Sequence, residues 1–209
     1  MFKELDIENW NRKTTYEFFK DYDDPFFNIT ANLDVTALYG FCKHNDLSFS
    51  LANLFYSLQT TNEIKEFRFR LLKGKVVEFD KVHATQTILN EDETFSFCYF
   101  EAKENIFDFN KAGKTAVEKY KKLHTFDVES ERLDLIYYSV IPWISFTSFK
   151  HAVCLNNKQS VPRIVFGKIF DENKCKKMPL SVEVNHALMD GLHVGDFFNR
   201  LQKTISNPF

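Results

Sequence analysis

The chain has little of what marks linkers, disulfide frameworks or membrane spans. Its 209 residues include only 4 cysteines, 5 prolines and 6 glycines. Cys42, Cys98, Cys154 and Cys175 are scattered without CxxC spacing, so we interpret them as reduced thiols of a cytoplasmic protein rather than a metal or redox site. No apolar run approaches the roughly 20 residues that cross a bilayer, and the acidic start is unlike a signal peptide.

A strong charge of either sign is also missing. The net charge is −2, so no basic field directs the chain toward nucleic acid or anionic lipid. Hydrophobic residues make up 44% of the sequence, and 24 phenylalanines supply apolar area for a core. Without repeats, low-complexity runs or a composition shift, residues 1–209 are predicted to form a single domain.

Hydrophobic periodicity predicts interleaved strands and helices. Strands are expected over residues 29–35, 94–100, 133–138, 163–170 and 178–186, and a hairpin over 67–71 and 76–79 around Lys73-Gly74. Helices are expected over residues 10–22, 48–58 and 106–123, and after Gly191, where apolar residues from Val194 to Ile205 follow one helical face. Because strands and helices do not alternate regularly, we predict an α/β fold, a two-layer α/β sandwich with a mixed, largely antiparallel sheet.

The segment around His186 carries the clearest chemical signal. Leu180, Val182 and Val184 alternate with polar residues, so they share one face of a strand. His186 follows in phase and is expected to point inward at the end of the strand, before an abrupt turn at Gly191. Imidazole titrates at about pH 6.5, which makes His186 a candidate general base.

Two other interpretations of this segment remain open from the residues alone. His186 could be a core histidine satisfied by backbone hydrogen bonds, with Asp190 as the N-cap of the last helix. A zinc site is the other alternative, because His186, Asp190 and His193 are spaced i, i+4, i+7. The strand pattern up to His186 and the glycine at 191 argue against the continuous helix that this zinc site requires.

Four segments resemble one known family. Residues 185–191, Asn-His-Ala-Leu-Met-Asp-Gly, are similar to the HHxxxDG signature of CoA-dependent acyltransferases, with Asn185 in place of the first histidine. Residues 139–149 resemble the SxxPWxxFxSF stretch of the chloramphenicol acetyltransferases, and residues 7–13 and 66–70 resemble other parts of that family. Corresponding stretches run in the same order from about residue 5 to 203, so the chain is identified as a member of this family.

The resemblance implies a reaction. His186 would remove the proton of a substrate hydroxyl, which attacks acetyl-CoA directly, without an acyl-enzyme or a permanently bound cofactor. The expected acceptor is the 3-hydroxyl of chloramphenicol, which inactivates the antibiotic. Ser139 would donate a hydrogen bond to the oxyanion, although alone it would be taken for a strand residue bonded to its own backbone. Asp190 would form a buried ion pair with Arg12 and hold the turn of the histidine. The alternative to an enzyme is a non-catalytic trimer of the same fold that binds a small molecule.

The resemblance also implies two binding regions and an assembly. Trp143, after Pro142, and Lys168 correspond to positions that contact coenzyme A. The acceptor pocket would be lined by Phe18, Phe19, Phe126, Phe149, His151, Arg163 and Val165. His151, Arg163 and Val165 stand where familiar members carry Leu, Ile and Thr, and Pro25 where they carry Cys. Burial of an arginine costs free energy unless the arginine is paired, so a small hydroxylated acceptor other than chloramphenicol is an alternative. The family further implies a homotrimer with active sites at the subunit interfaces. A dihydrolipoamide acyltransferase core is a rival that we disfavour, since no lipoyl module or Ala/Pro-rich linker is present.

Overall fold

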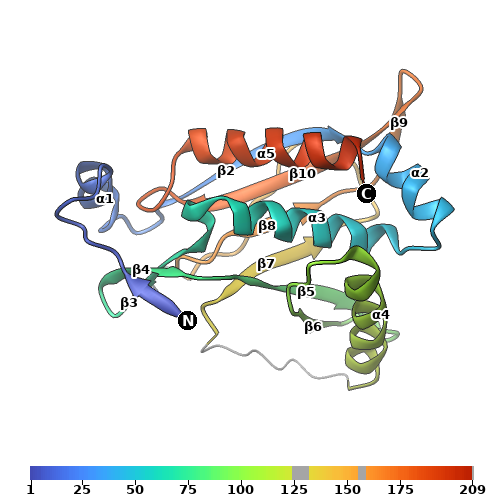
Figure 1. Ribbon diagram of the computed structural model, residues 1–209, viewed down its shortest axis with the longest axis horizontal. Coiled ribbons are helices and arrows are strands. Elements are labelled where there is room, and N and C mark those ends of the chain that lie inside the picture. The colour runs from blue at the N-terminus through green and yellow to red at the C-terminus, as the bar shows by residue number, and fades with distance from the viewer. Residues whose placement is uncertain (124–131, 155–158, 209) are drawn as a thin grey trace.

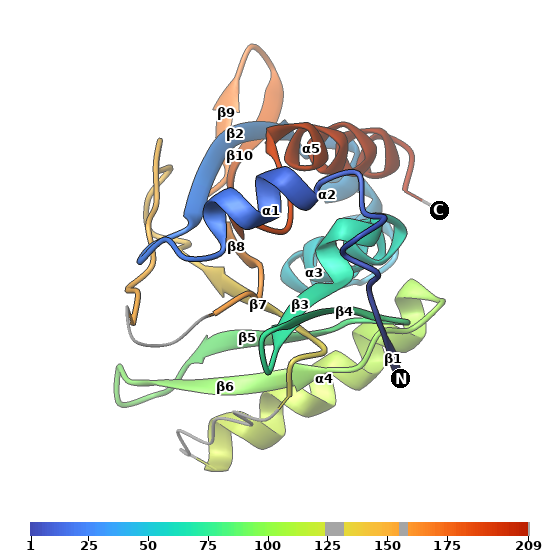
Figure 2. The same cartoon turned by 90° about the vertical axis from the view of Figure 1, so that its left-hand side faces the viewer.

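The computed structural model describes residues 1–123, 132–154 and 159–208. A twisted sheet forms one layer, and helices stacked along one of its faces form the other (Figures 1 and 2). This arrangement confirms the predicted two-layer α/β sandwich.

The larger sheet has seven strands and mixed pairing. In spatial order its strands are β2 (Phe26–Asp34), β10 (Cys175–Asn185), β8 (Arg163–Phe166), β7 (Leu135–Val140), β5 (His83–Leu89) and β6 (Phe95–Phe100), and β9 (Phe170–Glu172) pairs with β10. The β5/β7 and β7/β8 pairs are parallel, whereas the other pairs are antiparallel. The sheet is therefore mixed and largely antiparallel, as predicted.

A second, small sheet lies beside the first. Its strands are β1 (Phe2–Glu4), β4 (Lys75–Phe79) and β3 (Phe69–Leu72), preceded by a 3-10 helix over Lys65–Arg68. Lys73 and Gly74 form the predicted hairpin turn, with φ angles of 49° and 79°. Glycine has no Cβ to oppose this left-handed conformation, which explains its place at the turn.

The helices are α1 (Lys13–Phe19), α2 (Thr36–His44), α3 (Phe49–Glu63), α4 (Ile106–Leu123) and α5 (Gly191–Ser206). Leu54 and Leu58 of α3 and Phe197 and Leu201 of α5 are buried in the same core as the apolar face of β10. Tyr138 of the central strand β7 reaches this helix layer, where its hydroxyl lies 3.1 Å from Ser57 Oγ. In the described ranges, none of the helices combines the length and apolarity needed to span a membrane.

Some elements differ from the predictions. Helix α2 and strand β5 were not predicted, and the helix expected over residues 10–22 covers only 13–19. The strand expected over 163–170 ends at Phe166. Gly167 follows, where a Cβ would lie 3.0 Å from Phe146 and 3.1 Å from Pro179, so the backbone passes close to these two side chains before β9 begins.

Candidate active site

The turn after β10 sets the position of His186. The backbone N–H of His186 donates to the carbonyl of Pro25 at 2.8 Å, which extends the β2/β10 ladder by one bond. Asn185 is buried, and its Oδ1 accepts the N–H of Ala187 at 2.9 Å while its Nδ2 donates to the Gln159 carbonyl at 3.0 Å. The asparagine that replaces the first histidine of the signature therefore closes the turn.

Two aromatic rings and a carboxylate surround the imidazole of His186. Phe19 of α1 stacks on it with centroids 4.1 Å apart and planes 8° apart, and Phe27 of β2 lies at 4.7 Å. Nδ1 is buried and lies 3.2 Å from Asp190 Oδ1, without the geometry of a hydrogen bond. The side chain is 33% exposed in the single chain, so the ring is less enclosed than the strand phase predicted.

Arg12 and Asp190 meet beside this ring. An Nη1 nitrogen of Arg12 forms an ion pair with Asp190 Oδ2, and Nη2 donates to the His186 carbonyl at 3.1 Å. The arginine side chain is 9% exposed, but Asp190 is 37% exposed, so the ion pair is buried on its basic side only. Burial lowers the pKa of Arg12, which nevertheless stays far above neutrality.

Asp190 also begins helix α5. Its backbone N–H donates to His193 Nδ1 at 2.9 Å, and the two residues form a capping box at the first turn. Because α5 starts at Gly191, His186 and His193 do not share a continuous helix, which removes the geometric basis of the zinc alternative. The described residues contain no group of three or more His, Cys, Asp or Glu side chains arranged to hold a metal ion.

Ser139 lies in a different part of the chain, in a cavity of about 500 Å³ that we call the sheet cavity. The cavity occupies the face of the sheet opposite the Tyr138 hydroxyl and the helices, because Thr85, Tyr137 and Ser139 alternate with residues that face α3. Its lining is Thr85, Thr87, Phe95, Phe97, Tyr99, Leu135, Tyr137, Tyr138, Ser139, His151, Ala152, Gln159 and Arg163.

A second cavity, of about 410 Å³, lies between the sheet and helices α3 and α4, and we call it the helix-side cavity. Trp143 and Pro142 line it, together with Lys114 and Lys121 of α4. Thr87 lines both cavities, and its hydroxyl donates to Ser139 Oγ at 3.2 Å. The Ser139–Thr87 pair thus stands where the two cavities adjoin.

Lys168 does not line the helix-side cavity. Its side chain is exposed, and its backbone N–H donates to the carbonyl of Ile144 at 3.0 Å. The structure therefore brings Lys168 next to the loop that carries Trp143, but not into the cavity itself.

His151 and Arg163 both line the sheet cavity, where they meet a buried acid that sequence reasoning missed. Nη1 of Arg163 donates to Glu183 Oε1 at 2.6 Å, and the backbone N–H of His151 donates to Glu183 Oε2 at 3.2 Å. Arg163 also contacts Gln159 Oε1. Arg163 is therefore paired with an acid, so the free-energy cost of burying an unpaired arginine does not arise. The alternation along β10 places Glu183 on the strand face opposite Val182, and this register could have revealed it.

The other residues expected in an acceptor pocket are dispersed. Phe18 is exposed on α1, with its ring 4.9 Å from that of Phe19, near His186 rather than Ser139. Phe149 packs on His151 at 4.9 Å. Val165 is fully buried in register with Ser139. Phe126 lies outside the described residues.

Strand register separates His186 from Ser139 within one chain. Ser139 is opposite Val165 on β8, and Val165 is opposite Ser181 on β10. The five residues from Ser181 to His186 span about 17 Å of extended chain, and two strand spacings add about 10 Å across the sheet. A hydrogen bond acts over about 3 Å, so these two side chains of one chain cannot act on the same reacting atom.

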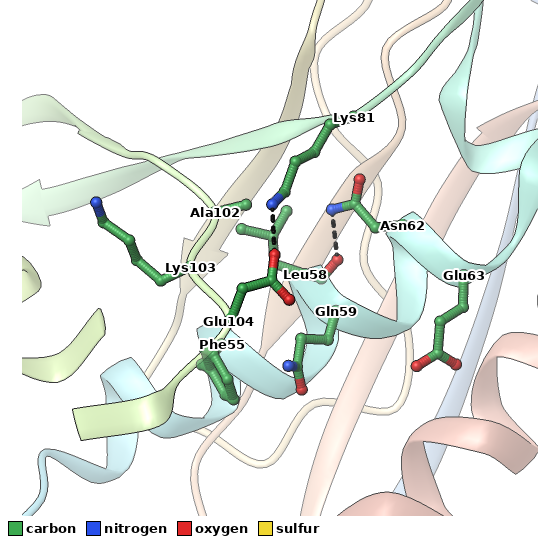
Figure 3. Close-up of a pocket in the computed structure, with 9 residues that line it drawn as sticks. All are labelled: Phe55, Leu58, Gln59, Asn62, Glu63, Lys81, Ala102, Lys103 and Glu104. Carbon is green, nitrogen blue, oxygen red and sulfur yellow. Dashed lines mark hydrogen bonds and ion pairs between the residues drawn. The ribbon is translucent and has the colours of Figure 1, made fainter. Parts of the chain in front are cut away.

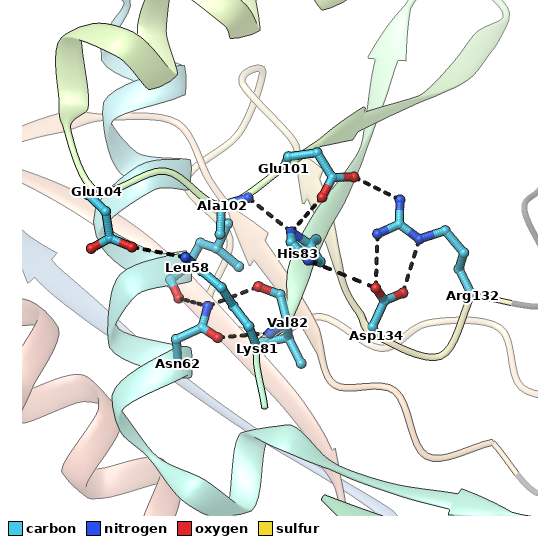
Figure 4. Close-up of polar contacts among 10 residues, drawn as sticks. All are labelled: Leu58, Asn62, Lys81, Val82, His83, Glu101, Ala102, Glu104, Arg132 and Asp134. Carbon is cyan, nitrogen blue, oxygen red and sulfur yellow. Dashed lines mark hydrogen bonds and ion pairs between the residues drawn. The ribbon is translucent and has the colours of Figure 1, made fainter. Parts of the chain in front are cut away.

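Two further polar regions lie away from His186 and Ser139. A cavity of about 220 Å³ beside α3 is crossed by an ion pair between Lys81 and Glu104 at 3.0 Å (Figure 3). In the neighbouring cluster, Arg132 pairs with Glu101 and Asp134, and His83 Nδ1 accepts the N–H of Ala102 at 3.0 Å (Figure 4). These contacts tie the start of β5 to the segments before α4 and β7, which is a structural role.

Comparisons with known proteins show the family of the chain. The family model "Chloramphenicol acetyltransferase" matches residues 1–202. A chloramphenicol acetyltransferase of Clostridium perfringens is 31% identical over 209 residues, covering 99% of this chain and 95% of the relative, and one of Escherichia coli is 31% identical over 200 residues, covering 95% and 91%. A solved chloramphenicol acetyltransferase superposes with a TM-score of 0.87 at 26% identity, covering 98% of this chain and all of that one. The dihydrolipoamide acetyltransferase of Azotobacter vinelandii, at 15% identity and a TM-score of 0.70 over 99% of this chain and 90% of its own, shares the fold.

These similarities define an acyltransferase. Within that class, the chain belongs to the chloramphenicol acetyltransferase family.

Proposed function

We propose that the protein transfers the acetyl group of acetyl-CoA directly to a substrate hydroxyl, with the 3-hydroxyl of chloramphenicol as the acceptor. The observation that carries this proposal is the environment of His186, a partly exposed imidazole whose orientation is fixed by two aromatic rings and Asp190. The names of the relatives support the choice of acceptor.

His186 would act as the general base through Nε2. Nδ1 is buried and faces Asp190, so the carboxylate favours the tautomer that carries its proton on Nδ1. The lone pair then lies on Nε2, which can accept the proton of the acceptor hydroxyl. Arg12 holds both the carboxylate and the His186 carbonyl, which keeps the ring in place.

Ser139 would stabilise the oxyanion. As His186 takes the hydroxyl proton, the acceptor oxygen bonds to the thioester carbon, and the carbonyl oxygen gains the negative charge. Thr87 donates its own proton to Ser139 Oγ, which leaves the Ser139 proton available for that oxyanion. Collapse of the tetrahedral intermediate breaks the carbon–sulfur bond, and the departing thiolate of CoA takes the proton from His186. No protein nucleophile or permanently bound cofactor takes part.

The two cavities supply separate approaches for the two substrates. The helix-side cavity, with Trp143 and the two lysines of α4, suits the phosphates and adenine of acetyl-CoA, and Lys168 lies beside the same loop. The sheet cavity, lined by aromatic rings, suits the acceptor. Their junction at Ser139 would bring the thioester and the hydroxyl together.

We further propose that the protein acts as a homotrimer with active sites between subunits. The separation of His186 from Ser139 supports this assembly, because a complete site then needs the histidine of one chain and the serine of its neighbour. Sedimentation should give a trimer, and an active monomer would contradict the proposal.

A thiol-release assay with acetyl-CoA tests the reaction. Wild-type protein should release CoA thiol in the presence of chloramphenicol and form the 3-O-acetyl product. His186→Ala should lower kcat by roughly 10²–10⁴ while the protein stays folded. His44→Ala, at an exposed histidine on α2, is the matched control and should keep full activity. Activity of His186→Ala within a few-fold of wild type would exclude His186 as the base.

A further inference from the structure

The sheet cavity contains a charged cluster within an otherwise aromatic lining. Arg163 and Glu183 are joined at 2.6 Å, and their side chains are 6% and 2% exposed. The Arg163 guanidinium also lies over the ring of Phe26, 4.7 Å from its centroid. Since each ion of the pair is already neutralised by the other, the cluster offers no free charge to a ligand.

Within this cluster, His151 can still form a hydrogen bond with a ligand. Its Nδ1 is buried 3.5 Å from Glu183 Oε2 and has no hydrogen-bond partner among the described residues. Burial raises the pKa of Glu183, but the neighbouring His151 side chain, the hydrogen bond from Arg163 and the backbone N–H of His151 outweigh burial and lower it, so the acid is ionised at neutral pH. An ionised carboxylate beside Nδ1 favours the tautomer with the proton on that nitrogen. Nε2 of His151 is then a hydrogen-bond acceptor for whatever fills the cavity.

Strand register measures the distance from this cluster to Ser139. Arg163 on β8 is opposite Tyr137, which is two residues before Ser139 on β7. Two residues of extended chain span about 7 Å, and one strand spacing adds about 5 Å across the sheet, so Ser139 and Arg163 lie about 8 Å apart. A ligand whose hydroxyl lies at Ser139 therefore reaches the cluster with a group about 8 Å away from that hydroxyl.

We propose that His151, held by the Arg163–Glu183 pair, recognises a neutral hydrogen-bond donor on the acceptor, such as a second hydroxyl or an amide N–H, about 8 Å from the acetylated hydroxyl. This proposal rests on the proposed function, because it assumes that the sheet cavity holds the acceptor. A carboxylate on the ligand would compete with Glu183 for Arg163, and an ammonium would compete with Arg163 for Glu183. An apolar group would leave Nε2 of His151 without a partner.

The test uses chloramphenicol analogues that differ only at the para position of the ring, with a hydroxymethyl, an ethyl or a carboxylate group. Calorimetry without acetyl-CoA measures their Kd for the full-length protein. The hydroxymethyl analogue should bind about tenfold more tightly than the isosteric ethyl analogue, and the carboxylate analogue should bind most weakly. His151→Leu should remove the preference for hydroxymethyl or reverse it. His44→Leu, the same change at an exposed histidine, should preserve it.

Two results would overturn the proposal: equal binding of the hydroxymethyl and ethyl analogues to the wild-type protein, or a preference that survives in His151→Leu. Tightest binding of the carboxylate analogue would likewise contradict a charge-neutral cluster. A parallel thiol-release assay separates this inference from the proposed function. Discrimination in binding without acetyl transfer to any analogue would support the His151 subsite and refute the acetyltransferase proposal. Acetyl transfer without discrimination would do the opposite.

Discussion

Replacement of Asp190 by alanine should destabilise the protein, because it removes two interactions at once. The first is the N-cap of α5, whose loss costs about 1 kcal/mol. The second is the counter-ion of Arg12, a side chain that is only 9% exposed. Breaking a fully buried pair costs roughly 3–5 kcal/mol. Here the cost is smaller, about 1–2 kcal/mol, because Asp190 is 37% exposed and Arg12 keeps its hydrogen bond to His186.

The expected loss for Asp190→Ala is therefore about 2–3 kcal/mol in the free energy of unfolding. Asp190→Asn keeps an oxygen for the cap and removes only the charge, so it should lose about 1–2 kcal/mol. Urea unfolding at one fixed protein concentration measures both, because association also contributes to stability. Both variants should also lose activity as His186 loses its orientation. An Asp190→Ala protein within 0.5 kcal/mol of wild type, on the order of the effect of a surface substitution, would refute this reasoning, and a loss of only about 1 kcal/mol would leave Asp190 as an exposed cap.

Three more predictions follow from the same geometry. Ser139→Ala should lower kcat by about 10²–10³ with little change in the KM for acetyl-CoA in a steady-state assay, whereas an effect on KM alone would mark a binding residue. Arg163→Ile should destabilise the protein by leaving Glu183 buried without a partner, and adding Glu183→Gln should restore most of the lost stability in urea unfolding; failure of that rescue would contradict the pairing. Several hydrogen bonds lower the pKa of Asp34 from 3.8 to about 2, and the one from the Thr36 side chain contributes most. The folded-state pKa is thus below the unfolded value, so the stability due to Asp34 is present above about pH 4 and is lost as the pH falls toward 2. Asp34→Asn should flatten the pH dependence of stability in that window, and an unchanged slope would contradict the pKa shift.

Residues that obey a local pattern could be predicted from the sequence. The alternation of Leu180, Val182 and Val184 predicted β10, and the helical spacing from Val194 to Ile205 predicted α5. Gly74 predicted the β3/β4 turn, because glycine tolerates the positive φ that the turn requires. Each of these features depends on residues a few positions apart, so a single sequence contains the necessary information.

Some features that depend on residues far apart in the sequence were not predicted. Arg163 was expected in a dry pocket, but its partner Glu183 is contributed by the neighbouring strand, 20 residues away. Replacing Arg163 by Ile and His151 by Leu would therefore leave the Glu183 carboxylate buried without its counter-ion. Likewise, the family motif identified His186 and Ser139 together, but only the strand register shows how far apart they lie in one chain.

Mixed assemblies test the central claim, that an active site combines His186 of one chain with Ser139 of its neighbour, most directly. His186→Ala and Ser139→Ala proteins are purified separately, dissociated, mixed in equal amounts and reassembled. At random mixing, about one quarter of the interfaces pair an intact histidine with an intact serine, so the thiol-release rate should rise to about one quarter of the wild-type rate. Each variant reassembled alone should keep at most about one hundredth of the wild-type rate. A mixture no more active than its components would contradict the shared site.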